Sequence, residues 1–271
     1  MKLVLATHNL GKIKEMKEIL GDFGVDVLSA EEAGVKEDVL EDGKTFKENA
    51  LKKAKFISER LNPPYSPFAK GGELNPPRPA EGGAQSPLKK GGSKGGFFKK
   101  GENPSPNLPL YKRGRSGGGF WAVADDSGIC IKALDDAPGV YSARWMCLHS
   151  GCDLDKEKIF SDNDLASFTL EKMRGVPSGK REAYFQCVIA LVLPNGENHI
   201  FEGKVKGQIA GELRGKSRPK LPYDLVFIPD GYKKTFAEMA DAEKNKISHR
   251  GLALKKLREF FESNKIFLEK H

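Results

Sequence analysis

The sequence predicts an α/β domain in which a mixed, twisted sheet is flanked by helices. Apolar runs of strand length alternate with segments of helical periodicity along most of the 271 residues. Between two strand-like runs, Pro194-Asn195-Gly196-Glu197 has the composition of a hairpin turn, which makes part of the sheet antiparallel. A chain of this length is also sufficient for one large domain with a sizeable core.

The first predicted elements are a strand over Lys2–Ala6, a helix over Gly11–Leu20 and a second strand over Val25–Leu28. Helical spacing places three apolar side chains on one face of the first helix, namely Ile13, Met16 and Leu20. A longer helix is expected over Thr45–Leu61, because Thr45 and Glu48 have the spacing of a capping box. Its expected buried face carries Ala50, Ala54, Ile57 and Leu61.

The later elements follow the same alternation. Two short strands, Trp121–Ala124 and Ile129–Ala133, are expected on either side of an acidic turn. The remaining elements are a mostly helical segment over Asp155–Met173, hairpin strands over Ala183–Leu193 and His199–Lys206, and a short strand over Leu225–Ile228. An amphipathic helix over Ser248–Ser263, with Leu252, Leu257, Phe260 and Phe261 on its apolar face, closes the pattern.

Residues 62–119 interrupt this pattern and hold 13 of the 30 glycines and 10 of the 16 prolines. The segment repeats itself, since Ser66–Gly72 returns as Ser86–Gly92 and Asn62-Pro63-Pro64 returns as Asn75-Pro76-Pro77. Such a composition buries too little apolar surface to offset chain entropy. We therefore expect a single domain spanning residues 1–271, interrupted by a disordered, low-complexity insertion.

Most of the net charge of +8 lies in this insertion, which has 10 Lys and Arg against 3 Asp and Glu. The rest of the chain is nearly neutral, and its charge gives no argument for a nucleic-acid partner. The alternative is a nucleic-acid-binding arm, because aromatic residues interleave with the lysines: Tyr65, Phe68, Phe97, Phe98 and Tyr111. Basic runs of this kind are usually solvated linkers, so nucleic acid is not the expected partner.

Composition also bears on where the protein works. The chain has no apolar run long enough for a secretory segment or a membrane span, so no membrane partner is expected. Its cysteines form no Cys-x-x-Cys pair, which favours a reduced, cytoplasmic protein. Cys147, His149 and Cys152 are close enough in sequence to be metal ligands, but a structural zinc site needs four ligands and no fourth is evident.

The most informative stretch is Asp125-Asp126-Ser127-Gly128, which follows an apolar strand. Two carboxylates at the end of a strand suit a hard cation such as Mg²⁺, which takes oxygen ligands and usually carries substrate phosphates with it. A second carboxylate there could remove a proton from attacking water as a general base. The alternative reading of these residues alone is an Asx-rich turn.

A second candidate site connects the first strand to the first helix and consists of Thr7, His8, Asn9, Leu10, Gly11 and Lys12. Gly11 permits close approach of the backbone, the helix start offers free N–H groups, and Lys12 adds a positive charge. This combination predicts a phosphate cradle, although the spacing of a Walker A loop is absent. The alternative is an ordinary helix entry with a solvated lysine.

Two further groups of residues complete the candidates. Glu41 precedes the capped helix and could add a carboxylate to a metal, whereas Glu48 is better explained as the box partner of Thr45. The segment from Lys244 to Arg250 places cationic and hydrogen-bond-donating side chains at the start of a helix capped by Ser248. Because cations are unfavourable at that end of the helix dipole, the pattern indicates a compensating anion or carbonyl oxygen.

Together these stretches resemble the non-canonical purine nucleoside triphosphate pyrophosphatases, also called inosine triphosphate pyrophosphatases. Five matches occur in the family's order: Ala6–Lys12, Glu41–Ala50, Ala124–Gly128, Ala137–Arg144 and Ile247–Arg250. They run the length of the chain except for residues 62–119. The resemblance implies a two-lobed fold around a nucleotide-binding cleft, and a homodimer.

The resemblance further implies hydrolysis of ITP, dITP and XTP to the monophosphate and pyrophosphate, with Mg²⁺ as cofactor. It assigns Asp126 as general base and metal ligand, Glu41 as a second metal ligand, and Asp125 as a supporting residue. The implied substrate contacts are Thr7, His8, Asn9, Leu10, Gly11, Lys12, Ser127, Tyr223, Asp224, Lys244, His249 and Arg250.

Base selection has a physical logic, because hypoxanthine and xanthine present a keto oxygen where adenine presents an amino donor. A donor such as Arg250 aimed there would pair with the first two bases and leave adenine unpaired. One departure stands against full activity. The family has Gly-Gly-Phe-Gly-Tyr-Asp-Pro where this chain has Ser217–Leu225, so Leu221 replaces a base-stacking Phe worth about 1–3 kcal/mol. The alternative function is therefore a nucleotide-binding protein with weak or lost activity.

Overall fold

The computed structural model describes residues 2–7, 12–13, 16–17, 20, 23–62, 119–151 and 160–264. These residues form a six-stranded sheet in the order β2-β1-β3-β4-β5-β6. The strands are β1 (Lys2–Leu5), β2 (Asp26–Ser29), β3 (Phe120–Ile131), β4 (Glu182–Val192), β5 (Asn198–Ile209) and β6 (Phe227–Pro229). Strand β1 pairs in parallel with β2 and β3, whereas β3 to β6 are antiparallel to one another, so the sheet is mixed as predicted.

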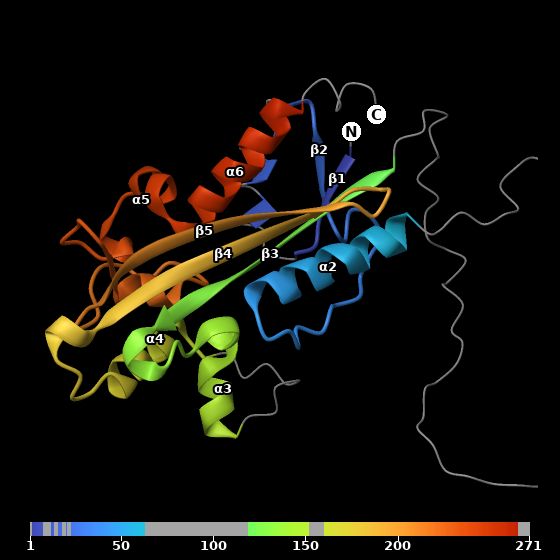
Figure 1. Ribbon diagram of the computed structural model, residues 1–271. Helices are drawn as coiled ribbons and strands as arrows, with labels where there is room; N and C mark the ends of the chain where they lie inside the picture. Colours follow the sequence, from blue (N-terminus) through green and yellow to red (C-terminus); the bar gives the residue numbers. More distant parts are fainter. Residues whose placement is uncertain are drawn as a thin grey trace, which may run out of the picture.

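Helices cover both faces of this sheet (Figure 1). Helix α2 (Phe46–Leu61) packs on one face against β3 and β4, and helix α6 (His249–Ser263) packs on the other against β4 and β5. The far ends of the long strands β3 to β5 carry the shorter helices α3 (Trp145–Ser150), α4 (Asp162–Lys172) and α5 (Asp241–Ile247). One group of elements lies near β1, and the other lies at the open end of the β4–β5 hairpin, opposite its turn. These two groups form the two lobes that were expected.

The hydrophobic core follows from strand alternation. Along β3, Trp121 and Val123 face the α6 side, while Ala122 and Ala124 face the α2 side. The described residues of the first predicted helix are helical, and its predicted apolar face is buried on the α6 side of the sheet: Ile13, Met16 and Leu20. A third cluster, built around Phe185, Phe227 and Phe236, fills the far lobe.

Helix α2 begins where the sequence predicted. Thr45 is its N-cap and accepts a hydrogen bond from the Glu48 N–H at 3.1 Å. The Glu48 carboxylate reaches one residue further back than in a capping box, because it accepts from the Lys44 N–H at 2.7 Å. Ala50, Ala54 and Ile57 are buried as expected, and Leu61 is partly buried against the same cluster.

Several elements differ from the predictions in their bounds. The two short strands around the acidic stretch are one continuous strand, β3, and no turn separates Asp126 from Ile129. Helix α4 begins only at Asp162, with Ser161 as its N-cap, and residues 152–159 lie outside the described residues. Leu225 ends a 3₁₀ turn, η6 (Pro222–Leu225), and does not belong to the following strand.

The closing helix has a broader buried face than expected. Ala253 and Leu254 are buried beside Leu257 and Phe261, whereas Leu252 and Phe260 are only half-buried. Within the described residues, no helix combines the length and the apolar composition that crossing a membrane requires.

The two ends of the predicted insertion lie side by side. The Asn62 side chain accepts from the Phe120 N–H at 2.9 Å and donates to the Phe120 carbonyl at 2.7 Å. Residues 63–118 lie outside the described residues, so the predicted disorder of the insertion stays a prediction. Because positions 62 and 119 are adjacent, the rest of the chain can close as one domain whatever the length of the intervening segment.

Candidate active site

The acidic pair lies in the middle of β3, at the point where β1 ends. The Ala6 N–H donates to the Val123 carbonyl at 2.8 Å, and after Ala6 the chain leaves the sheet toward the first helix. Beyond Val123, strand β3 therefore continues past the carboxyl end of a parallel neighbour, which is where open α/β sheets place ligands. The prediction of a tight turn was wrong, because the stretch is paired with β4: Asp125 opposite Ile189, and Asp126 opposite Val188.

A continuous strand sends adjacent side chains to opposite faces of the sheet, so the two carboxylates do not point to one place. Asp125 faces the α6 side and Asp126 faces the α2 side, as their partners show. Each carboxylate therefore has its own set of charged neighbours.

Asp125 lies between two cations. Its two carboxylate oxygens are each 2.9 Å from the Lys12 ammonium, and Oδ2 is 3.5 Å from Arg250 Nε. Burial alone would raise the pKa of Asp125, but the charges of Lys12, Arg250 and Lys53 outweigh it and hold that pKa well below its usual value. Asp125 is the anion that the cationic start of α6 was expected to need.

Asp126 is in the opposite situation. It is 7% exposed, and burial, together with the nearby Glu41 and Asp125 charges, raises its pKa from 3.8 to about 6, although Lys53 and Asn49 act in the other direction. One of its oxygens, Oδ2, is buried without a hydrogen-bond partner in the described part of the chain. A carboxylate in this state is suited to accept a proton near neutral pH.

Lys53 joins Asp126 to Glu41 and is not among the site residues predicted from the sequence. Its ammonium lies 3.2 Å from Glu41 Oε1 and 3.7 Å from Asp126 Oδ1. Burial would lower the pKa of Lys53, but the charges of Asp126, Glu41 and Asp125 raise it. A signal was present, because Lys53 occupies the apolar stripe of α2 between Ala50 and Ile57, where a charge requires partners.

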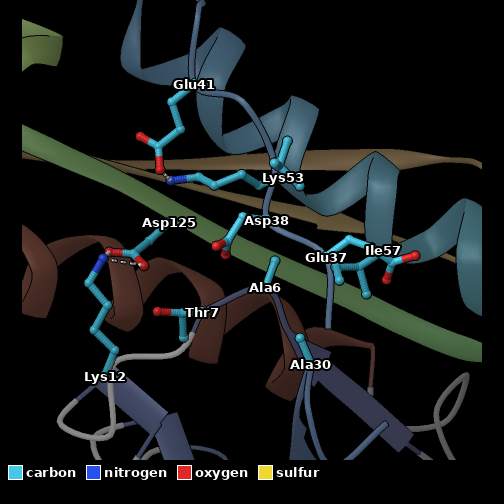
Figure 2. Close-up of a pocket in the computed structure, with 11 residues that line it drawn as sticks. Ala6, Thr7, Lys12, Ala30, Glu37, Asp38, Glu41, Lys53, Ile57 and Asp125 are labelled. Atoms are coloured by element: carbon cyan, nitrogen blue, oxygen red, sulfur yellow. Dashed lines mark hydrogen bonds and ion pairs between the residues drawn. The ribbon is translucent and has the colours of Figure 1, made fainter. Parts of the chain in front are cut away.

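A pocket of about 170 Å³ opens beside these two ion pairs. Figure 2 shows Lys12 with Asp125, Glu41 with Lys53, and Thr7 around it. The volume is below the ~300–1,000 Å³ of most ligand sites, so this pocket can hold only part of a nucleotide, such as its phosphates. His8, Asn9, Leu10 and Gly11 lie outside the described residues, so the predicted phosphate cradle is described only at its ends.

A second charged cluster lies in the far lobe. The Lys244 ammonium donates to Asp224 Oδ2, and Arg218 Nη1 is 3.8 Å from the same oxygen. Burial raises the pKa of Asp224, against the opposing charges of Lys244, Arg218 and Arg250. Lys244 belongs to the last turn of α5, where the helix dipole favours a cation, so its predicted place at the start of α6 was wrong.

His249 lies at the first turn of α6, between the two charged clusters. Its ring stacks on Phe185, with centroids 4.5 Å apart and planes 6° apart. Burial and the positive charges of Arg250 and Lys244 lower its pKa well below the usual value, so the ring is neutral at physiological pH. His249 Nδ1 is buried without a hydrogen-bond partner among the residues that the structure describes. An orphaned polar atom of this kind is free to bind a ligand group.

Glycine allows α6 to begin this close to the sheet. A Cβ at Gly203 in β5 would lie 2.0 Å from the His249 carbonyl oxygen, so no other residue fits there. Ser248 caps the helix by accepting from the Gly251 N–H at 3.0 Å.

The remaining predicted site residues differ in accessibility. Ser127 is half-buried in β3, and its N–H donates to Asp126 Oδ1 at 3.1 Å. Tyr223 is 5% exposed within the far-lobe core, where its hydroxyl donates to the Ser142 carbonyl at 2.6 Å. Leu221 is half-buried two residues before it. The structure thus uses the Tyr223 hydroxyl to join the η6 turn to the rest of the lobe.

Among the described residues, no group of three or more His, Cys, Asp or Glu side chains is arranged to hold a metal ion. Mg²⁺ is commonly bound by only one or two carboxylates together with substrate phosphates. Glu41 and Asp126, with an orphaned oxygen on Asp126, offer the hard oxygen ligands of such a site. Of the other candidate set, Cys152 lies outside the described residues, and His149 Nδ1 lies 3.0 Å from the Trp145 carbonyl oxygen.

Comparison with known proteins gives consistent matches along the chain. The model of the Ham1 family matches residues 3–67 and 110–260. The dITP/XTP pyrophosphatase of Clostridium perfringens is 37% identical over 258 residues, which cover 95% of this chain and 96% of that protein. The dITP/XTP pyrophosphatase of Bacillus subtilis is 33% identical over 260 residues, covering 96% of each chain.

Solved structures show the same likeness. The Ham1 protein of Staphylococcus aureus superposes with a TM-score of 0.67 at 27% identity, over 97% of this chain and 100% of that chain. A nucleoside-triphosphatase, or dITP/XTP pyrophosphatase, from Mycobacterium abscessus superposes with a TM-score of 0.60 at 29% identity, over 95% and 98% of the two chains.

Proposed function

This chain belongs to the Ham1 family, and from that premise we propose that it hydrolyses non-canonical purine nucleoside triphosphates, namely ITP, dITP and XTP, to the monophosphate and pyrophosphate. Relatives that carry this activity in their names match almost the whole chain. The structural observation that carries the proposal is Asp126, a buried carboxylate beside Lys53 and Glu41 whose pKa is raised to about 6.

Asp126 is proposed as the general base that takes a proton from the water attacking the α-phosphate. Its raised pKa makes it a better proton acceptor than an ordinary aspartate, while leaving it largely ionised above pH 7. Lys53 orients this carboxylate and Glu41 together, because it is the cation that both contact. Asp125 is unsuited to the same role, because Lys12 and Arg250 stabilise its ionised form.

Glu41 and Asp126 are the residues proposed to hold Mg²⁺. When bound, Mg²⁺ would supply charge neutralisation on the phosphate oxygens. Lys12 and Thr7, at the pocket wall, would bind the triphosphate together with the segment between them.

The base is proposed to lie toward the far lobe, where His249, Arg250 and the Asp224–Lys244 pair are found. A neutral His249 with an open ring nitrogen can pair with a base edge without adding charge. Arg250 is oriented by Asp125, and its guanidinium is the donor proposed to meet a keto oxygen. A purine with an amino group at that position would leave the donor unpaired, which disfavours adenine.

A homodimer remains part of this proposal and rests on the resemblance alone, whereas the cytoplasmic location rests on the absence of a Cys-x-x-Cys pair. A second candidate function, nucleotide binding with weak or lost turnover, is favoured by one observation. Leu221 in the segment 217–225 offers no aromatic face to a base.

The deciding experiment measures Mg²⁺-dependent pyrophosphate release from dITP, XTP, ATP and GTP, with Asp126→Asn as the matched control. The proposal predicts turnover of dITP and XTP, little turnover of ATP, and loss of activity in the variant. GTP carries the same keto oxygen as dITP, so its turnover measures whether a feature other than the Arg250 donor selects the base. Binding of dITP by folded wild-type protein without pyrophosphate release would instead support the second function.

A further inference from the structure

The motif Ala137–Arg144 is one of the five family matches, and the proposed chemistry gives it no role. In the structure its last six residues form the 3₁₀ turn η4 (Gly139–Arg144), which packs on β3 directly after the acidic pair. Ser142 joins the turn to β3 and also closes the turn internally. Ser142 Oγ accepts from the Ile129 N–H at 2.9 Å and donates to the Gly139 carbonyl at 2.6 Å.

The contact between η4 and β3 leaves no space. A Cβ at Gly128 would lie 2.3 Å from Ser142 Oγ and 2.5 Å from the Gly139 carbonyl oxygen. The Tyr223 hydroxyl donates to the Ser142 carbonyl at 2.6 Å and joins the same turn to η6. Arg144, at the end of η4, therefore extends from a rigid base.

Arg144 reaches across the site to the segment that carries Glu41. Its Nη2 donates to the Glu41 backbone carbonyl at 2.9 Å, over a separation of 103 positions in the sequence. Its guanidinium also lies 5.9 Å from the ring centroid of Tyr141. The segment it holds, residues 36–42, has no regular secondary structure and is largely exposed. A charge-assisted hydrogen bond to this backbone fixes the position of the Glu41 main chain, from which its side chain extends.

We infer that Arg144 is a positioning residue for Glu41, and that it acts through the Glu41 carbonyl to keep one metal-binding carboxylate beside Lys53 and Asp126. The inference rests on the proposed function, in which Glu41 and Asp126 hold a divalent cation. Outer partners that orient a metal ligand contribute about 10- to 100-fold to metal affinity. Arg144 touches neither substrate nor reacting atoms in this assignment, so its effect falls on metal binding and not on the chemical step.

The test uses Arg144→Gln in the full-length protein and Mn²⁺ alone as the probe. Binding is followed by electron paramagnetic resonance without nucleotide, and Mg²⁺ activation of dITP hydrolysis is measured separately. We expect the Mn²⁺ dissociation constant and the Mg²⁺ concentration for half-activation to rise about tenfold. At saturating Mg²⁺, kcat should stay within about twofold of wild type.

Matched variants separate this effect from a general disturbance. Glu37, in the same 36–42 segment, forms an exposed ion pair with Arg60 in which the charged atoms are 3.2 Å apart. Arg60→Gln removes this pair and should leave metal binding unchanged. Glu41→Gln should weaken Mn²⁺ binding as well, and adding Arg144→Gln to it should weaken binding little further, because the two act through one ligand. Arg144→Lys keeps the positive charge and an N–H donor for the Glu41 carbonyl, and it should recover most of the affinity even where the glutamine variant folds poorly.

The inference is overturned if Arg144→Gln binds Mn²⁺ as wild type does while Glu41→Gln does not, or if kcat falls with unchanged metal affinity. It is also overturned if the folded wild-type protein binds no Mn²⁺. Failure of the proposed function has a different signature, namely absence of pyrophosphate release from dITP by a protein whose Mn²⁺ binding still depends on Arg144.

Discussion

Replacing the proposed general base should stabilise the protein while abolishing its activity. Asp126 is 7% exposed, and its pKa rises from 3.8 in an open chain to about 6 in the fold. The folded state therefore resists ionisation of a group that ionises freely on unfolding. Asp126→Asn keeps the shape and the acceptor for the Ser127 N–H and removes the buried charge.

The direction and size of the effect follow from linkage. A raised pKa means that the folded state binds the proton more tightly, so stability is full below pH 3.8 and is lost as the pH rises toward about 6. A pKa difference of this size corresponds to about 3 kcal/mol, at about 1.4 kcal/mol per pKa unit. At pH 8 the Asn variant should therefore be more stable by about 3 kcal/mol, or about 6–12 °C in Tm for a domain of this size.

The assay is thermal unfolding of both proteins in EDTA between pH 4 and pH 8, beside pyrophosphate release with Mg²⁺ at pH 8. The stability gain should be near zero at pH 4 and should reach its full value above pH 6. Chelation is needed because a cation bound to the ionised carboxylate would stabilise the wild type. An Asn variant that is less stable than wild type at pH 8, or a gain independent of pH, would refute the reasoning.

Four other changes test separate parts of the structure. Lys53→Met should raise the pKa of Asp126 further and move the acid limb of the kcat/KM profile to higher pH, since it removes the cation 3.7 Å away. Gly128→Ala should lower the free energy of unfolding in urea by about 1–3 kcal/mol, because a Cβ meets Ser142, whereas Gly179→Ala, with open space, should be neutral. Leu221→Phe should lower KM for dITP about tenfold by supplying a stacking face. Replacing residues 63–118 with a short Gly-Ser linker should preserve fold and turnover, since Asn62 already contacts Phe120, and any loss of nucleic-acid binding would instead revive the arm hypothesis.

Elements that depend on local signals were predicted well. The start of α2 follows from Thr45 and its apolar stripe, and the β4–β5 hairpin follows from its turn sequence. The start of α6 follows from the Ser248 cap. In each case the information lies within a few residues of the element, so the sequence was sufficient.

The acidic strand shows where local signals fail. Asp, Ser and Gly are poor strand formers, and their run predicts a turn. Strand β4 runs antiparallel beside it and pairs with every residue from Ala122 to Ile131, which extends β3 through the unfavourable run. The contacts of Lys53 with Asp126 and of Arg144 with Glu41 could not be predicted from the sequence either, because each joins positions that only the fold brings together.

The continuity of β3 also decides which aspartate does the chemistry. Had the pair formed a turn, both carboxylates would share one set of cations, and nothing would distinguish their pKa values. Strand alternation instead places Asp125 beside Lys12 and Arg250, which keep its carboxylate ionised and unsuited to act as a base. It places Asp126 in a buried position beside Glu41, where both carboxylates contact Lys53 and the pKa of Asp126 is raised. Environments that separate the pKa values of two neighbouring acids are how a site assigns their roles.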